Sequence, residues 1–442
     1  MSTTIAVPTE AGTVVGRQHR GVRLFLGIPY AEAPTGPRRF AAPLPRGGFT
    51  RPYDASRPGA TAQRVPLFAT TTIPEPSVPG DDILNISVTA PDADGCPVLV
   101  WIHGGGFLAG SPASPWYDGR AFARGGVVTV TVGYRLGVDG FAVLDDVPTN
   151  LGLRDVLLAL DWVRENIAAF GGDPDRVTVA GQSAGGAIVL ALLSSPTGRG
   201  RFQRAVSLSG GLFEVEATRA RAFLARLGEH LGVPPTRAGF ARCAPELVQR
   251  GVLDLRGDDG TLVLGPVLGD DILPLPLAEG LSVHGQDVPL LLGATGDEFD
   301  GYRHGDGDGE RGSRAAGTRI TDTLFRSACP RTAAARRAAP AGTWLYSFEW
   351  PSPALGGAVH CVDLPFFFDV LDAPGVPEAL GPNPPAELAA RMHTDLVGFV
   401  RGETPAWGRA TGRLGDPARA YGQPLAADTR GVYDPVTGGD PC

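Results

Sequence analysis

The sequence is poor in cysteine and contains no long hydrophobic run. Its 442 residues include five cysteines, and their positions (96, 243, 329, 361 and 442) match no metal-ligand spacing. Because an odd number suits reduced thiols, we expect a cytoplasmic protein. No apolar segment approaches the length of a membrane span, and residues 1–12 lack the basic and apolar parts of a signal peptide.

Lysine is absent, so all 39 cationic side chains are arginine. With 47 acidic residues the net charge is −8 at pH 7, which gives no reason to expect nucleic acid or an anionic membrane as a partner. Internal repeats are absent as well. A chain of this length can bury a large core, and α/β folds of this size often form one domain.

Strand-like and helix-like runs alternate along most of the chain, which predicts a mostly parallel sheet covered by helices. The expected strands are residues 98–102, 177–180, 288–293 and 344–350, and the expected helices are 154–170, 217–231 and 385–401. The first 40 residues differ, since short runs at 13–15 and 22–28 predict a small antiparallel edge. We expect one domain over residues 1–442, with a helical insertion at 211–280 and a solvated loop at 301–317.

A serine lies at a sharp strand-to-helix turn. Residues 181–185 read Gly-Gln-Ser-Ala-Gly, directly after an apolar run and before the helix-like residues 186–193. Such an elbow lifts a hydroxyl out of the sheet, and its glycines allow strand and helix to pass closely. The five-residue pattern is weak evidence in a chain with 62 glycines, but this context makes Ser183 the candidate nucleophile.

Three consecutive glycines follow another expected strand. Residues 103–107 read His-Gly-Gly-Gly-Phe and come directly after residues 98–102. Backbone N–H groups in such a loop, together with the N–H of the residue after a nucleophile, can hold a developing oxyanion. A glycine-rich turn without a chemical role is the alternative interpretation.

The acid and the base of a triad should follow the serine in that order. Asp297 and Glu298 come just after the expected strand 288–293, where open α/β sheets place their sites, and both are candidates. Of the later histidines, His304 lies in a Gly/Asp/Arg stretch and His393 in an expected helix. His360 precedes an apolar block that could fix its loop, so it is the favoured base. We interpret its neighbour, a cysteine, as structural, because adjacent side chains in an extended segment point apart.

Together these motifs resemble the type-B carboxylesterase family of α/β-hydrolases, nearly from end to end. The other segments that carry the resemblance are 25–31 (Phe-Leu-Gly-Ile-Pro-Tyr-Ala), 37–40 (Pro-Arg-Arg-Phe), 81–85, 133–137 (Gly-Tyr-Arg-Leu-Gly), 150–155, 159–163 and 166–174. The resemblance implies an α/β-hydrolase fold and a serine hydrolase that cleaves small-molecule carboxylic esters without cofactor or metal. It implies the following site residues: nucleophile Ser183, acid Glu298, base His360, and the N–H groups of Gly105, Gly106 and Ala184 as oxyanion donors.

The resemblance also implies supporting residues. Ser209 matches a serine that supports the acid–histidine pair, and two structural ion pairs are expected, Arg39 with Asp81 and Arg135 with Asp155.

The chain departs from the family pattern at three points. Phe299 replaces the glycine that usually follows the triad glutamate, Ile83 replaces a disulfide cysteine, and 62 residues separate Glu298 from His360, fewer than expected.

Two alternatives to an esterase remain. A related acyl-group enzyme (a thioesterase, carbamate hydrolase, lactone-forming enzyme or acyltransferase) would use the same acyl-enzyme. A non-catalytic binding module of the same fold usually lacks the nucleophile or the histidine, and this chain keeps both.

Overall fold

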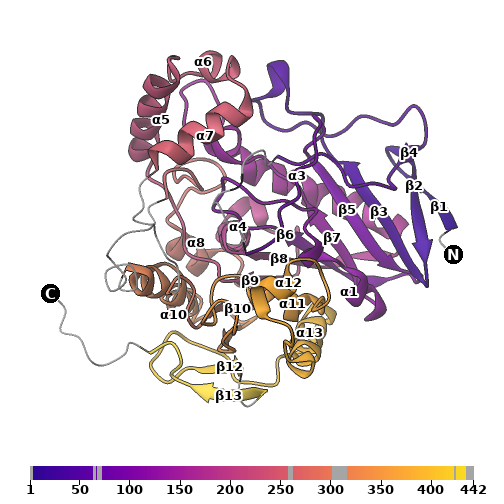
Figure 1. Cartoon of the computed structure of the whole chain (residues 1–442), viewed down its shortest axis with the longest axis vertical. Helices are drawn as coiled ribbons and strands as arrows, with labels where there is room; N and C mark the ends of the chain where they lie inside the picture. The colour runs from indigo at the N-terminus through magenta and orange to yellow at the C-terminus, as the bar shows by residue number, and fades with distance from the viewer. Residues whose placement is uncertain are drawn as a thin grey trace.

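A sheet of thirteen strands runs through the molecule (Figure 1). The computed structural model describes residues 3–62, 66, 72–256, 262–300, 316–422 and 425–434. His304, Cys442 and most of the expected loop 301–317 lie outside these residues. The strands are β1 (Thr3–Thr9), β2 (Gly12–His19), β3 (Val22–Pro29), β4 (Tyr53–Asp54), β5 (Asn85–Pro91), β6 (Cys96–Ile102), β7 (Val128–Val132), β8 (Gly172–Gln182), β9 (Arg204–Leu208), β10 (Leu290–Thr295), β11 (Thr343–Phe348), β12 (Pro417–Tyr421) and β13 (Ala426–Arg430).

The sheet has a parallel centre and antiparallel edges. Its strand order is β1-β2-β3-β5-β7-β6-β8-β9-β10-β11-β12-β13, and β4 pairs with β2. Neighbours from β7 through β12 pair in parallel, whereas β1, β2, β3 and β5 form an antiparallel edge and β13 closes the other side antiparallel to β12. The mostly parallel sheet and its antiparallel N-terminal edge confirm the predicted fold class.

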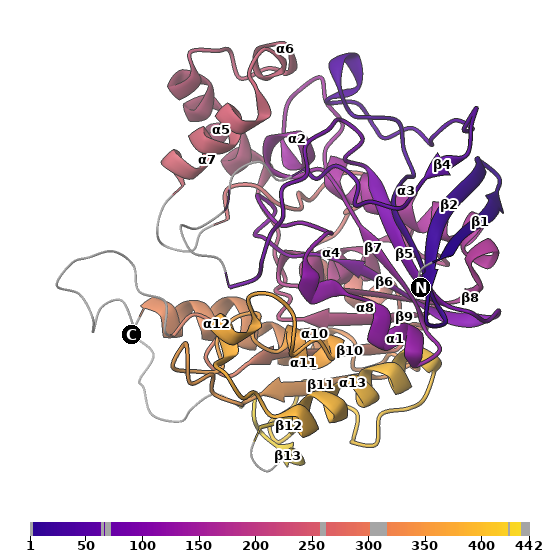
Figure 2. The same cartoon turned by 45° about the vertical axis from the view of Figure 1, so that its right-hand side comes forward.

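Helices cover both faces of the parallel strands. They are α1 (Arg120–Arg124), α2 (Gly137–Phe141), α3 (Leu151–Asn166), α4 (Ala184–Leu193), α5 (Ala217–Leu231), α6 (Arg237–Ala241), α7 (Pro245–Leu255), α8 (Leu277–Val283), α10 (Ala328–Ala335), α11 (Leu364–Phe368), α12 (Val376–Leu380) and α13 (Ala386–Arg401). Shorter turns are η1 (Gly36–Arg38), η2 (Pro115–Tyr117), η3 (Ile167–Phe170), η4 (Pro196–Gly198) and the π-helical η5 (Thr321–Arg326). Helices α5, α6 and α7 form a group at the top of the molecule in both views (Figures 1 and 2).

The central strand β6 shows why the sheet is covered on both sides. Val98, Val100 and Ile102 belong to a core cluster that includes residues of α3 and α4, and Leu99 and Trp101 belong to a second cluster with residues of α11 and α13. Side chains alternate across a strand, so a run that is apolar at every position buries both of its faces.

Two buried arginines brace the loops around the parallel centre. Arg135, in the loop after β7, donates to the Asp155 carboxylate on α3 at 2.8 and 2.6 Å, and both side chains are almost completely buried. This is the expected ion pair. The other expected pair is not formed, because the Arg39 guanidinium instead donates to both carboxylate oxygens of Asp139 on α2 and to the carbonyls of Phe240 and Cys243. The family resemblance correctly predicted that Arg39 forms an ion pair, but it predicted the wrong aspartate.

We expect Asp155→Ala to lower the free energy of unfolding by about 3–5 kcal/mol, because the substitution leaves a buried guanidinium without its counter-ion. The matched control is Asp161→Ala on the same helix, whose partner Arg201 is about a quarter exposed. A solvent-accessible pair of this kind contributes about 0–1 kcal/mol. Urea unfolding measures both values, and equal effects would contradict a stabilising role for the buried pair.

Candidate active site

Ser183 lies at the turn that joins β8 to α4. Its backbone has φ +56° and ψ −122°, a conformation that a residue with a side chain rarely adopts. The Ser183 N–H donates to the Leu208 carbonyl at the end of β9, at 2.9 Å, and fixes the turn against the neighbouring strand. The residue is 9% exposed. The predicted elbow is therefore present, with the serine at its apex.

The elbow glycines permit contacts that no side chain would allow. A Cβ on Gly185 would lie 2.0 Å from the Ile102 carbonyl oxygen, and a Cβ on Gly181 would lie 2.4 Å from the Gly185 carbonyl carbon. Any larger residue would push α4 away from the strands that position Ser183. The glycine pattern thus has a steric cause.

The buried carboxylate of Glu298 forms a hydrogen-bonded pair with the partly buried ring of His360. One carboxylate oxygen of Glu298, Oε2, contacts His360 Nδ1, and the other, Oε1, accepts the Thr295 N–H at 2.9 Å. The two residues are also joined through the main chain, because the backbone N–H of His360 donates to the backbone carbonyl of Glu298 at 2.8 Å. With Nδ1–H facing the carboxylate, Nε2 is the ring nitrogen that carries no proton in neutral His360. It lies on the side of Gln182 and the elbow.

The surroundings raise the pKa of His360 well above its ordinary value. Burial alone would lower this pKa, but the neighbouring Cys361 and the Glu298 carboxylate outweigh it. Ser183 Oγ makes no hydrogen bond to another described residue, a common state of catalytic contacts before substrate binds. Gln182, the residue before Ser183, contacts the imidazole, and its amide nitrogen lies 3.2 Å from His360 Nε2.

The glycine loop after β6 presents free N–H groups. Gly105 and Gly106 have φ +114° and +59°, and their N–H groups, like that of Ala184 at the first position of α4, donate to no other described residue. His103 anchors the loop, because its ring stacks on Tyr134 at 4.6 Å. Burial lowers the pKa of His103 to about 4, so this ring stays neutral.

The structure separates the alternative candidates. Asp297 accepts the Ala358 N–H at 2.7 Å and so braces the loop before His360, without facing the imidazole. His393 bonds to the Phe367 carbonyl at 2.9 Å and packs on Phe122 in the helix layer. The Ser209 hydroxyl is buried without a hydrogen-bond partner among the described residues, and its supporting role stays a prediction.

Sequence reasoning missed Gln182. Its amide nitrogen contacts both His360 Nε2 and, at 3.1 Å, Cys361 Sγ. The expectation that His360 and Cys361 point apart is wrong, because Cys361 has φ +75°, outside the extended region. The signal for Gln182 was its place directly before the nucleophile, at the end of a strand.

An aromatic wall stands beside His360. Phe299, the residue in place of the family glycine, lies 5.0 Å from the imidazole, and so does Phe325 of η5. The two phenyl rings stack at 5.4 Å, and Phe213 packs edge-on against Phe325. The wall gives the imidazole an apolar surface on one side.

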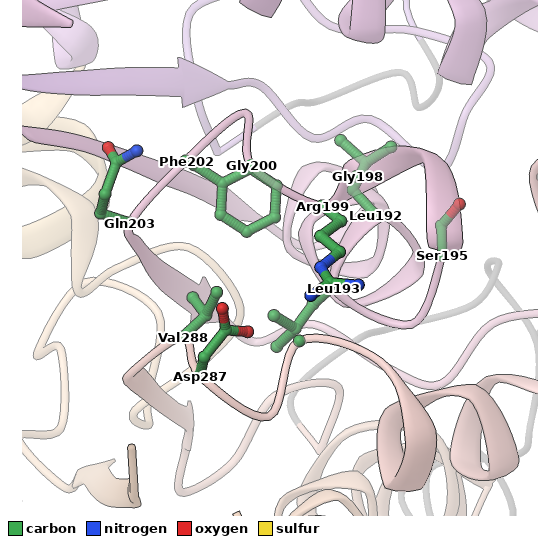
Figure 3. Close-up of a pocket in the computed structure, with 11 residues that line it drawn as sticks. Leu192, Leu193, Ser195, Gly198, Arg199, Gly200, Phe202, Gln203, Asp287 and Val288 are labelled. Carbon is green, nitrogen blue, oxygen red and sulfur yellow. The ribbon is translucent and has the colours of Figure 1, made fainter. Parts of the chain in front are cut away.

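A separate pocket of about 190 Å³ lies away from these residues (Figure 3). Phe202 and Gln203 on its wall precede β9, and Asp287 and Val288 precede β10. The pocket is thus at the amino ends of the strands, whereas Ser183 and the other site residues follow carboxyl ends, where parallel sheets place their active sites. It is not part of the candidate active site.

Within the described ranges, no cluster of histidine, cysteine and carboxylate side chains could hold a metal ion. Nor does any helix in that part of the chain have the length and apolar character needed to cross a bilayer.

Comparisons with known proteins agree with this geometry. Residues 3–305 match the sequence model of the Carboxylesterase family. A para-nitrobenzyl esterase of Bacillus subtilis (strain 168) is 35% identical over 413 residues, covering 83% of each chain, and a phenmedipham hydrolase of Pseudarthrobacter oxydans is 33% identical, covering 93% of each. A solved PNB esterase structure has a TM-score of 0.86 at 30% identity over 97% of both chains. A Geobacillus stearothermophilus carboxylesterase has a TM-score of 0.83 at 31% identity, over 97% of this chain and 98% of that one.

Proposed function

The chain belongs to the carboxylesterase family and is a carboxylic ester hydrolase, and we propose that Ser183, His360 and Glu298 are its catalytic triad. The observation that carries this assignment is the contact between Glu298 Oε2 and His360 Nδ1, together with a serine held at positive φ. That contact leaves Nε2 as the base on the side of the elbow.

In this mechanism Ser183 Oγ attacks the ester carbonyl carbon while His360 Nε2 takes the hydroxyl proton. The carboxylate of Glu298 orients the ring and stabilises the imidazolium that forms. The carbonyl oxygen becomes an oxyanion, which the N–H groups of Gly105, Gly106 and Ala184 hold.

Collapse of the tetrahedral intermediate breaks the bond to the leaving alkoxide, which takes the proton from His360 and departs as the alcohol. Water then attacks the acyl-enzyme with His360 again as base, and the acid is released with Ser183 restored.

Turnover across nitrophenyl esters of graded acyl length, with a thioester and a carbamate in the same panel, tests the function. Esters should be cleaved with the highest kcat/KM. Preferential turnover of the thioester or the carbamate would move the assignment to another acyl-group enzyme, because all of them share the acyl-enzyme.

We infer that the chain is a single catalytic domain over residues 1–442, with residues 211–280 as a cap. Two contacts support the cap. Gln249 of α7 donates to the Leu108 carbonyl in the oxyanion loop at 2.8 Å, and Arg39 donates to the Cys243 carbonyl at 2.7 Å. The partner proposed is a small-molecule ester, with no nucleic acid or membrane, and the odd number of cysteines favours a cytoplasmic location.

We expect kcat/KM to rise with pH through an apparent pKa above the ordinary histidine value of about 6.5. Only neutral His360 accepts the Ser183 proton, so a raised pKa moves the acidic limb to higher pH. Glu298→Gln should move the limb back to lower pH, because it removes the carboxylate. His393→Gln is the control and should leave the limb in place. A profile that is flat down to about pH 4.5 would exclude a histidine base.

A further inference from the structure

The Tyr433 hydroxyl contacts both β10, the strand that precedes the candidate acid, and its parallel neighbour β11. It accepts the Ala294 N–H of β10 at 2.9 Å and donates to the Tyr346 carbonyl of β11. Leu290 N–H bonds to the Gly342 carbonyl and Gly296 N–H to the Phe348 carbonyl. Every second residue of β10 points its N–H toward β11, so the ladder partner of the Ala294 N–H is the Tyr346 carbonyl. The hydroxyl thus contacts both atoms of one ladder position, where β10 and β11 are paired without a break.

A glycine gives the hydroxyl its place there. A Cβ on Gly293 would lie 2.1 Å from the Tyr346 carbonyl oxygen, so only glycine leaves that oxygen open to Tyr433.

Arg326 fastens the C-terminal segment to the same strand end. Its guanidinium lies 4.8 Å from the centre of the Tyr433 ring, and Nη2 donates to the Val432 carbonyl at 2.7 Å. Nη1 donates at 3.3 Å to the Thr295 carbonyl at the end of β10. A cation over an aromatic face adds to these bonds.

These contacts hold the backbone on which Glu298 depends. The peptide N–H of Thr295 orients the carboxylate through its 2.9 Å bond to Oε1. Tyr433 fixes the preceding residue at Ala294, and Arg326 fixes the Thr295 carbonyl. We propose that Tyr433 is a positioning residue for the triad: through the end of β10 it sets the alignment of Glu298 with His360. The inference rests on the proposed function of that pair.

The test is Tyr433→Phe in the full-length enzyme, because this change removes the hydroxyl and keeps the ring under Arg326. With active sites counted by organophosphate titration, kcat should fall about tenfold with KM changed less than about twofold, since misalignment affects the chemical step more than binding. The matched control is Tyr421→Phe. Tyr421 is also buried, on the neighbouring strand β12, and its hydroxyl donates to Asp395 at 2.9 Å.

Tyr433→Phe removes two hydrogen bonds and Tyr421→Phe removes one, so both should lower Tm, but only Tyr433→Phe should lower kcat. Proton NMR supplies a readout that needs no turnover: the low-field resonance of the His360 Nδ1 proton should shift in Tyr433→Phe and stay in place in Tyr421→Phe. Equal kcat in the two variants, with an unshifted resonance, would overturn the proposal.

A failure of the proposed function has a different signature. It would appear as wild-type ester turnover that does not depend on Ser183, and the NMR comparison would still decide whether Tyr433 positions Glu298 and His360.

Discussion

Ser183→Ala should lower kcat/KM for nitrophenyl esters by about four to six orders of magnitude, because the members of a triad act as a unit. In the proposed mechanism the Ser183 hydroxyl is the attacking atom, and no other serine occupies a strand-to-helix elbow in the described part of the chain. The remaining turnover would come from the oxyanion donors and from binding alone.

The matched control is Ser194→Ala, at the opposite end of α4. Ser194 is also buried, and its hydroxyl bonds to the Ala191 carbonyl at 2.8 Å. This variant should keep its activity. If Ser183→Ala retained a tenth of wild-type turnover, the nucleophile would have to be sought elsewhere.

Glu298→Gln should lower kcat by about three to four orders of magnitude with KM little changed. The carboxylate stabilises an imidazolium that exists only along the reaction path, so its loss affects the transition state more than substrate binding. The change keeps the size of the side chain, and Oε1 can still accept the Thr295 N–H.

The neighbouring carboxylate provides the control for this variant. Asp297 binds the Ala358 N–H and does not contact the imidazole, so Asp297→Asn should reduce kcat less than about tenfold. Steady-state kinetics of the two variants rank the two acids. If Asp297→Asn were the more damaging change, the acid of the triad would be reassigned.

Four parallel strands, β6, β8, β10 and β11, could be predicted from the sequence because each contains an apolar run. The parallel strands β7, β9 and β12 were not predicted, since polar residues interrupt them. The strand β1 was missed as well. Among its residues only Val7 is buried, so the run lacks the apolar density of a strand, and it forms by pairing with β2. An edge strand of this kind depends on its neighbour more than on its own pattern.

The order of motifs identified the serine, the histidine and the glycine loop, but it left two adjacent carboxylates open. The turn after β10 favours Glu298 as the proposed acid, because Glu298 contacts the imidazole and Asp297 binds the Ala358 N–H in the next loop. A pattern of residue types contains no information on that turn.

Long-range side-chain partners were beyond the sequence. Arg39 binds Asp139 and not the aspartate that the resemblance implied, because the partner depends on where α2 docks. Tyr433 lies 139 residues beyond Ala294, the residue whose N–H it accepts. Neither contact is marked in the sequence by a periodicity or a spacing that would predict it.

Covalent labelling of the wild-type enzyme by a fluorophosphonate tests the central claim most directly. Such a reagent phosphonylates an activated serine and stops turnover. Intact-mass and peptide mass spectrometry should find one label per chain, on Ser183, with ester hydrolysis lost in proportion to labelling. Full labelling at another residue, or hydrolysis that continues after Ser183 is fully labelled, would contradict the assignment of this site.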